Sequence, residues 1–146
     1  MKLNNEEVKK LLPHRDPFLW VDEVLECEPG KYAVATKYMS PDLAIYKGHF
    51  PSFPITPGVI TVEAMAQTAG VATALLNTGE NAEPRLGFFA GIENARFKRK
   101  ILPGDTIVMK SVVRDPNARF VYADCEATVN GEIAATATIS FVFAKQ

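Results

Sequence analysis

His49 and Glu63 are the two side chains of this sequence whose types and surroundings best suit acid–base chemistry. His49 comes just before a segment in which Pro51, Pro54 and Pro57 alternate with phenylalanines, and each proline restricts the backbone. A stiff loop that holds an imidazole beside the start of a helix suits general acid–base catalysis, because such catalysis depends first on where the proton carrier lies. The alternative is that His49 only satisfies local backbone groups, and its context favours neither interpretation.

Glu63 is a carboxylate inside an otherwise apolar helix that we predict over residues 59–76. Burying a carboxylate without a partner is costly, so Glu63 is expected either to find a partner or to keep its proton. A carboxylic acid that keeps its proton can donate it to a leaving group. Gln67 lies one helical turn further on the same face and can hydrogen-bond Glu63. The alternative, an acid favoured there only by the helix dipole, accounts less well for the apolar neighbours.

Gly58 stands where this helix begins. A glycine there lets a ligand approach closely, and the first N–H groups of a helix have no partner within it. Such donors can stabilise the oxyanion that forms when a carbonyl compound loses its α-proton. The alternative is a plain helix start, and Gly58 alone does not decide between the two.

The elements that position these residues are predicted from turn signals and hydrophobic periodicity. Asn5 is expected to cap a short helix, EEVKKLL, that Pro13 ends. The long helix is expected to start at Pro57 and Gly58 and to end near residues 77–79, before a polar loop at 80–84. Strands are predicted over residues 18–28, 31–40, 86–98, 106–115, 119–129 and 132–143, with turns at 29–30, 102–105, 116–117 and 130–131.

The long helix is apolar nearly all round, so it must be surrounded by other elements. The sequence therefore predicts an α+β fold in which an antiparallel sheet curls around one central helix. Residues 59–76 approach the length of a membrane span, but Glu63 and Gln67 in their first half favour a helix in a protein core.

Composition limits the class of protein. The 146 residues are 47% hydrophobic and 23% charged, which predicts one folded domain over residues 1–146. The net charge of −1 gives no reason to expect nucleic acid or a membrane surface as the main partner. The polar start has no secretory signal, and Cys27 and Cys125 have no metal-type spacing, so we expect a cytoplasmic protein with reduced cysteines.

The segment GHFPSFPITPGVITVEAMAQ resembles the signature of the FabZ-type β-hydroxyacyl-acyl-carrier-protein dehydratases. That signature is HFP, two residues, P, two residues, PG, and then a helix with Glu and A-x-A-Q. LPHRDPFLWVDEV and FFAGIENARFKRKILPGD resemble two further segments of the family, so the likeness spans residues 11–105. The residues that match the signature are His49, Pro54, Pro57, Gly58, Glu63 and Gln67.

This resemblance implies a hot-dog fold and the conversion of a (3R)-3-hydroxyacyl thioester on acyl carrier protein to the trans-2-enoyl thioester. The pathway would be type II fatty acid synthesis or a related polyene or polyketide pathway. His49 would remove the α-proton, the Gly58 N–H would hold the carbonyl oxygen, Glu63 would protonate the leaving hydroxyl and Gln67 would orient Glu63. The family also implies a dimer that takes His49 from one subunit and Glu63 from the other, assembly into a hexamer, and no metal or organic cofactor.

The acyl chain is expected to lie in a tunnel, for which the candidates are Phe50, Phe53, Ile60 and Phe88. Phe88 stands where many FabZ-type members have a gating Tyr, and Asp16, Thr56 and Thr61 also depart from the usual pattern. Glu63 stands where related dehydratase–isomerases have Asp, which favours dehydration without isomerisation.

A basic cluster is expected to receive the acidic carrier protein, although a solvated strand end explains it equally well. Its members are Arg96, Lys98, Arg99 and Lys100. Two other functions stay open on the same fold: a thioesterase, and an acyl-binding subunit without catalysis. A thioesterase would need an acid placed to activate water rather than the pairing of His49 with Glu63. The intact set of His49, Glu63 and Gly58 speaks against the subunit without catalysis.

Overall fold

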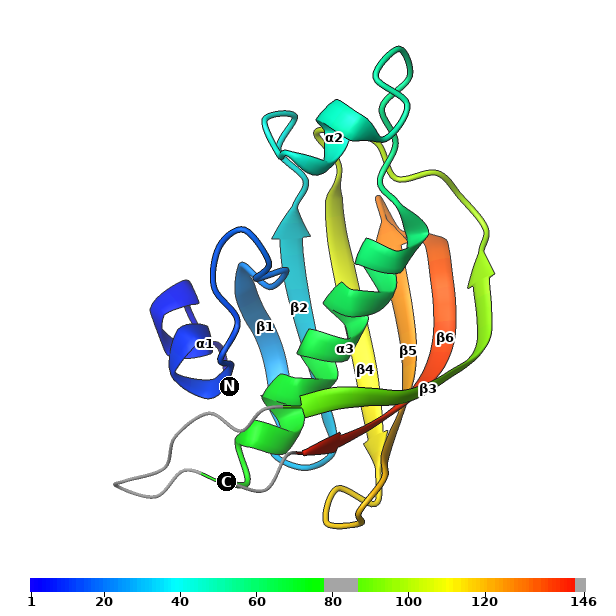
Figure 1. Cartoon of the computed structure of the whole chain (residues 1–146). Coiled ribbons are helices and arrows are strands. Elements are labelled where there is room, and N and C mark those ends of the chain that lie inside the picture. Colours follow the sequence, from blue (N-terminus) through cyan, green and yellow to red (C-terminus); the bar gives the residue numbers. More distant parts are fainter. Residues whose placement is uncertain (78–86, 144–146) are drawn as a thin grey trace.

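A six-stranded antiparallel sheet curls around one 17-residue helix, α3 (Gly58–Ala74) (Figure 1). The computed structural model describes residues 1–77 and 87–143. The strand order across the sheet is β1-β2-β4-β5-β6-β3, and the predicted α+β arrangement is confirmed. The strands are β1 (Glu23–Glu28), β2 (Tyr32–Tyr38), β3 (Gly87–Phe97), β4 (Thr106–Arg114), β5 (Val121–Val129) and β6 (Glu132–Phe143).

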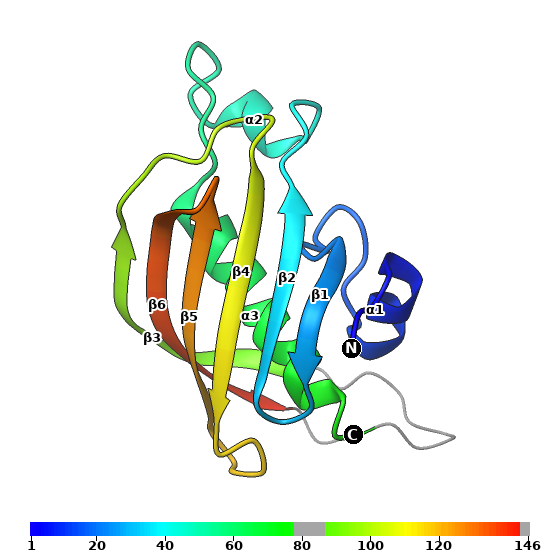
Figure 2. The ribbon, with the colours of Figure 1, turned by 180° about the vertical axis from the view of Figure 1, so that it is seen from behind.

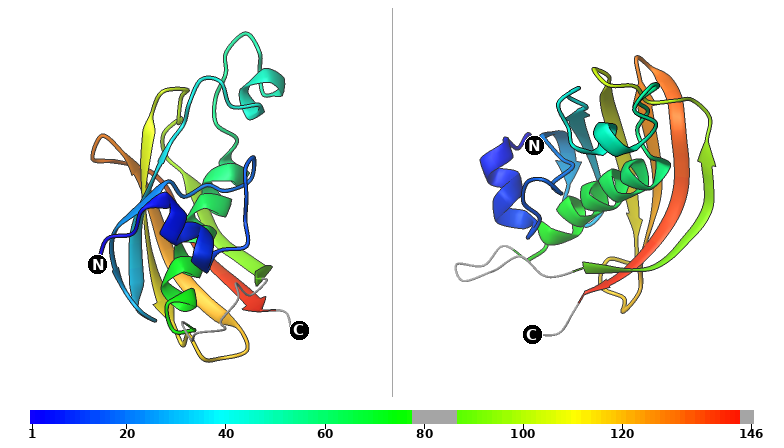
Figure 3. Two further views of the ribbon diagram at one scale, coloured as in Figure 1. Left: turned by 90° about the vertical axis from the view of Figure 1, so that its left-hand side faces the viewer. Right: turned by 45° about the horizontal axis from the view of Figure 1, so that its top comes forward.

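The core lies between α3 and the concave face of the sheet. β4 and β5 bury alternate residues, so every second side chain points at the helix. A short helix, α1 (Asn5–Leu11), packs beside α3 (Figure 3). No helix of the described part covers the outer face of the sheet (Figure 2). Because the sheet and α1 pack against α3, most sides of this helix are buried, as its apolar sequence predicts.

Two tight turns hold the sheet in register. Asn130 and Gly131 have φ values of 51° and 78°, the pair of left-handed conformations that a two-residue hairpin needs, and they join β5 to β6. Gly30 has φ 73° in the turn between β1 and β2, and its N–H donates to the Ala72 carbonyl at 2.8 Å. This hydrogen bond from Gly30 to Ala72 ties the β1–β2 hairpin to the last turn of α3.

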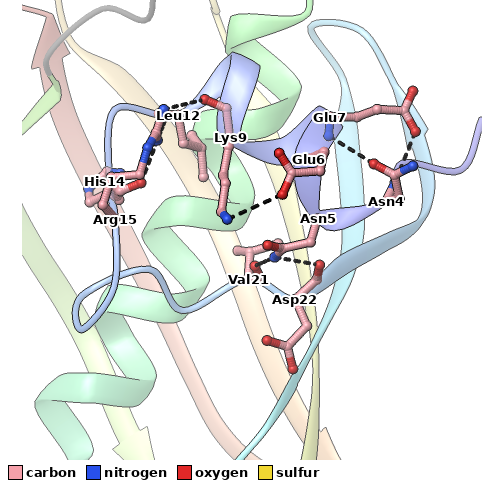
Figure 4. Close-up of polar contacts among 10 residues, drawn as sticks. All are labelled: Asn4, Asn5, Glu6, Glu7, Lys9, Leu12, His14, Arg15, Val21 and Asp22. Atoms are coloured by element: carbon pink, nitrogen blue, oxygen red, sulfur yellow. Dashed lines mark hydrogen bonds and ion pairs between the residues drawn. The ribbon is translucent and has the colours of Figure 1, made fainter.

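Two predicted boundaries are wrong, and side-chain hydrogen bonds explain both. β1 begins at Glu23 rather than at residue 18, because the Trp20 N–H and the Phe18 carbonyl bond the Gln67 side chain instead of a neighbouring strand. The cap of α1 is Asn4, whose side chain accepts the Glu7 N–H while the Glu7 carboxylate accepts the Asn4 N–H (Figure 4).

Asn5 has a different task from the predicted cap. Its side-chain amide donates to the carbonyls of Val21 and Asp22 and so ties α1 to the chain that enters β1 (Figure 4). A short helix, α2 (Ile45–Gly48), lies in the stretch between β2 and α3, for which the sequence predicted no regular structure. The predicted polar loop at residues 80–84 and the predicted strand start at residue 86 lie outside the described residues.

Cys27 and Cys125 are both buried and free. Cys27 pairs across the sheet with Ala33, Ala33 with Ser111, and Ser111 with Cys125. Three strand spacings separate the cysteines by roughly 14 Å, which is beyond the reach of a disulfide. Burial raises the pKa of the Cys125 thiol to about 11, so this thiol stays protonated at neutral pH.

Within the described residues, no helix combines the length and the apolar content that crossing a bilayer would require.

Candidate active site

His49 follows directly after α2, and one of its ring nitrogens is already bound. Nδ1 lies 2.8 Å from the carbonyl oxygen of Ile55. A carbonyl oxygen only accepts, so Nδ1 carries a proton, and in the neutral tautomer with this proton the lone pair is on Nε2. The contact with Ile55 is the local backbone role that the alternative interpretation expected. It leaves Nε2 available, and a neutral imidazole with a free Nε2 can take a proton from a substrate.

The loop that carries His49 folds back on itself. Phe50 has a left-handed backbone with φ 56°, and the Phe53 N–H donates to the Phe50 carbonyl at 2.7 Å. At the end of the loop, the Thr56 N–H donates to the Ile101 carbonyl, and the Thr56 hydroxyl contacts the buried Tyr46 hydroxyl at 2.6 Å. These bonds, together with the three prolines, fix the position of the imidazole relative to the start of α3.

Gly58 is the first residue of α3 and lies beside His49. Pro57 is the N-cap, and no side chain of the described residues caps the helix. The Ile60 N–H donates to the Pro57 carbonyl at 3.0 Å, so the N–H groups of Gly58 and Val59 are the ones without a partner within the helix. A Cβ on Gly58 would lie 2.8 Å from Cε1 of Phe97, so any side chain at this position would require the exposed Phe97 ring to move. His49, Gly58, Thr61 and Phe97 line one pocket, which we call the His49 pocket.

Glu63 lies in the second turn of α3 with its side chain 19% exposed. Its Oε2 accepts a hydrogen bond from Nε2 of Gln67 at 2.8 Å, so the predicted contact between the two residues is confirmed. Gln67 is itself buried and fully bonded: Nε2 also donates to the Phe18 carbonyl, and Oε1 accepts the Trp20 N–H. The amide of Gln67 is thus fixed, and it fixes one oxygen of Glu63 in turn.

A second pocket opens at Glu63, which we call the Glu63 pocket. Glu63 and Gln67 line it from α3, Phe88 and Phe89 from β3, and His14 from the loop after α1. Ala66, Gly70 and Ala74 continue the same face of α3 along the pocket, so an apolar groove leads away from the carboxylate.

Within one chain, the two predicted catalytic residues line different pockets. His49 and Gly58 belong to the His49 pocket, and Glu63 and Gln67 belong to the Glu63 pocket. One chain alone therefore does not place the acid and the base around a common substrate.

His14 is a polar residue of the site that the sequence did not single out. Its Nε2 lies 3.6 Å from Oε2 of Glu63. Burial lowers the pKa of the His14 imidazole, Arg15 lowers it further, and the nearby Glu63 carboxylate opposes both. The signal in the sequence was that only two histidines occur in the chain.

The tunnel candidates lie in different places. Phe88 lines the Glu63 pocket. Phe50 and Phe53 are exposed on the loop after α2, and Ile60 is buried in the core; none of these three lines either pocket.

Three of the four candidate docking residues line the His49 pocket: Lys98, Arg99 and Lys100. Arg99 also has structural partners, because its guanidinium contacts Glu132 at 3.1 Å and donates to the Val129 carbonyl at 3.1 Å. Lys100 lies over the Phe53 ring at 5.1 Å. Arg96 lies in β3 and does not line the pocket.

Comparison with known proteins identifies the family. The model of the FabA-like domain matches residues 12–138. A 3-hydroxyacyl-[acyl-carrier-protein] dehydratase FabZ from Ruminiclostridium cellulolyticum is 45% identical over 143 residues, which cover 98% of this chain and 99% of the relative. A FabZ of the same description from Caldanaerobacter subterraneus is 43% identical over 144 residues, 99% of this chain and 100% of the relative. The chain belongs to the FabZ dehydratases of the FabA-like family.

Solved structures agree with the fold of a FabZ protein. The dehydratase heterocomplex ApeI:P from Xenorhabdus doucetiae has a TM-score of 0.79 at 19% identity, covering 95% of this chain and 91% of that chain. A hypothetical thioesterase with coenzyme A from Streptococcus pneumoniae has a TM-score of 0.62 at 14% identity, covering 84% and 85%. The predicted hot-dog fold is confirmed. At these identities the likeness concerns the fold alone, and the fold does not separate a FabZ dehydratase from a thioesterase.

Proposed function

We propose that this chain dehydrates (3R)-3-hydroxyacyl groups on acyl carrier protein to trans-2-enoyl groups, in type II fatty acid biosynthesis or a related polyene or polyketide pathway. The observation that carries the proposal is the arrangement of Glu63 and His49 in a chain whose sequence relatives are dehydratases. Glu63 accepts a hydrogen bond from Gln67 at 2.8 Å; His49 has its Nδ1 bound to a carbonyl, and no described residue hydrogen-bonds its Nε2. The relatives that are 45% and 43% identical along nearly their whole length are named for this reaction.

The reaction needs one proton removed and one supplied. Nε2 of His49 takes the α-proton, and the N–H groups at Gly58 hold the thioester oxygen while charge builds up on it. Glu63 gives a proton to the β-hydroxyl, the Cβ–O bond breaks, and the double bond forms between Cα and Cβ as water leaves. The proton gained by His49 and the one lost by Glu63 balance, and their exchange resets the pair for the next substrate.

The site needs two copies of the chain. β3 is an edge strand that pairs only with β6 among the described strands. Its exposed apolar side chains leave an unprotected edge, which favours pairing with a second chain. These side chains are Phe88, Phe89, Ile92 and Phe97.

The two ends of β3 show how pairing completes the site. Phe88 and Phe89 near its start line the Glu63 pocket, and Phe97 at its end lines the His49 pocket. If two β3 strands pair antiparallel about a twofold axis, the start of one strand meets the end of the other. The Glu63 pocket of one subunit then faces the His49 pocket of its partner. A homodimer therefore supplies two complete sites, and a hexamer would add contacts between such dimers.

The substrate arm enters through the His49 pocket. Lys98 and Lys100 line it, and cations there attract an acidic carrier protein and increase the association rate. The acyl tail then follows the apolar groove at Ala66, Gly70 and Ala74, with Phe88 beside it. Buried, unpaired Cys27 and Cys125 fit a reducing cytoplasm. No metal or organic cofactor takes part in the proposed steps.

The test is to mix the purified protein with a 3-hydroxyacyl-carrier-protein and to follow enoyl absorbance and free thiol together. We expect enoyl formation without thiol release, and its loss in His49→Ala and in Glu63→Gln. Thiol release without enoyl formation would identify a thioesterase. Acyl binding with neither signal, for short, medium and long chains, would identify a non-catalytic acyl-binding protein.

A further inference from the structure

The second histidine of the chain contacts the same carboxylate oxygen as Gln67 does. His14 Nε2 lies 3.6 Å from Oε2 of Glu63, and Gln67 Nε2 donates to this same oxygen at 2.8 Å. Among the described residues, no group donates a hydrogen bond to the other oxygen, Oε1. The two oxygens of Glu63 therefore have different surroundings: Oε2 faces protein groups and Oε1 is left for a substrate.

The loop that carries His14 is fixed at its start. The Arg15 guanidinium donates to the carbonyls of Lys9, Leu12 and His14 at 2.7–3.0 Å, so it closes the end of α1 and holds the backbone at His14 (Figure 4). Leu12 packs against α3, because a Cβ on Gly70 would lie 3.2 Å from its Cδ2.

The same loop is fixed at its far end. Gln67 bonds the Phe18 carbonyl and the Trp20 N–H, so residues 12–20 meet α3 at both ends of the loop. An imidazole in such a loop has a defined position relative to Glu63, and this is what a positioning contact requires.

His14 is neutral near pH 7. Burial is the main cause that lowers the pKa of its imidazole, and Arg15 adds to it, whereas Glu63 raises it. The other charged side chain among the described residues that line the pocket is Lys10. In the described part of the chain, Nδ1 of His14 is buried without a partner. Because a buried N–H without a partner is rarer than a buried acceptor without one, the ring proton belongs on Nε2, which faces Glu63.

We propose that His14 is a positioning residue that, together with Gln67, keeps Oε2 of Glu63 an acceptor and so keeps the acidic proton on Oε1. This proposal rests on the proposed function and extends its site by one residue. Gln67 and His14 both present N–H groups to Oε2, so a proton on Oε2 would face donors and find no acceptor. The protonated acid therefore carries its proton on Oε1 and directs this O–H towards the β-hydroxyl of the substrate. At 3.6 Å the contact is longer than a hydrogen bond, so the proposal requires it to shorten when the substrate fills the pocket, as catalytic contacts often do in the complex.

The kinetic test compares His14→Gln with His14→Leu. The Gln amide nitrogen reaches the place of Nε2 and keeps a donor, whereas Leu fills the space without one. His14→Leu is expected to lower kcat between about tenfold and about a hundredfold with KM nearly unchanged, and His14→Gln to restore most of kcat. Equal losses in both variants, with both melting like the wild type, would mean that the imidazole itself carries a proton, and the positioning role would be rejected. An unchanged kcat in His14→Leu would also reject it.

A second readout does not depend on activity. Nitrogen NMR of the imidazole in the full chain reports which ring nitrogen bears the proton and at what pH the ring titrates. We expect the proton on Nε2, and a His14 pKa that falls further in Glu63→Gln, because the carboxylate that raises it is gone. A proton on Nδ1, or a His14 pKa that does not respond to Glu63→Gln, would overturn the proposal. If the NMR result holds but the wild type forms no enoyl product, it is the proposed function that fails.

Discussion

The side-chain amide of Gln67 donates to Oε2 of Glu63 at 2.8 Å, one turn apart on the same helix. The same amide holds the backbone of Phe18 and Trp20, which belong to the loop over the helix. One side chain thus orients the proposed catalytic acid and joins the loop to α3. Orientation and stability are coupled at this residue, and a substitution there is expected to affect both.

Gln67→Leu is expected to lower kcat at least about tenfold, because Glu63 loses its fixed donor. It also leaves the Trp20 N–H and the Phe18 carbonyl without their partner, at a cost of about 1–3 kcal/mol of unfolding free energy for each buried group. Enoyl assays and urea unfolding measure the two effects. The matched control is Ser111→Ala, which removes a buried hydrogen bond to the Met65 carbonyl on the same helix. That variant should lose stability and keep kcat; an equal loss of kcat there would mean that any weakening of α3 disables the enzyme.

Gly58→Ala is expected to displace the exposed Phe97 ring, because the new methyl group overlaps it, and to destabilise the protein by about 1 kcal/mol, the lower end of the range for overpacking. The displaced ring lines the His49 pocket, so kcat should also fall, and Phe97→Leu in the same chain should recover part of both losses. Gly48→Ala is the control, since a Cβ at Gly48 has nothing within 4 Å. Thermal unfolding and enoyl assays give the comparison. If Gly58→Ala is as harmless as Gly48→Ala, the close approach of Phe97 does not restrict this position.

The unfolding free energy is expected to fall as the pH falls below the ordinary histidine pKa of 6.5, in part because of His14. Its pKa is lowered in the folded chain, so the unfolded chain takes up the proton first and is favoured at acid pH. The contribution of His14 to the unfolding free energy is therefore fully present above pH 6.5, and it is lost as the pH falls through the lower pKa that His14 has in the folded chain. Urea unfolding between pH 5 and 8 should show a flatter curve for His14→Gln than for the wild type. Parallel curves for the two proteins would show that His14 is not desolvated.

Lys98→Glu together with Lys100→Glu is expected to raise KM for carrier-bound substrate and to leave kcat nearly unchanged, because both lysines line the pocket of His49. The effect should shrink as salt is added. Arg99 is left unchanged because it bonds Glu132 and Val129. Lys31→Glu together with Lys110→Glu makes the same change of charge outside both pockets, in the turn before β2 and in β4. Equal KM values for the two double variants would reject docking at this cluster.

Local sequence signals predicted most of the fold. The hairpin at Asn130 and Gly131, the start of α3 at Gly58 and the bond between Gln67 and Glu63 all follow from residues close together in the chain. The start of β1 did not, because the backbone of residues 18–20 is bonded by a side chain 47 residues away or more.

The candidate site was predictable in part for the same reason. Signature spacing pointed to His49 and Glu63, which lie in one continuous segment. His14 was missed because its neighbour Glu63 is brought to it only by the packing of the α1 loop on α3. Sequence alone also did not reveal that the two catalytic candidates line separate pockets of one chain, joined through opposite ends of β3.

The most direct test of a dehydratase site built by two subunits is a mixing experiment. His49→Ala and Glu63→Gln, each inactive alone, are unfolded, combined in equal amounts and refolded together, and enoyl formation is measured. If each site takes His49 from one chain and Glu63 from its partner, random pairing makes one site in four intact, and the mixture should recover about a quarter of the activity of wild type treated in the same way. If the mixture stays inactive while refolded wild type recovers, His49 and Glu63 do not meet across two subunits, and the proposed site is contradicted.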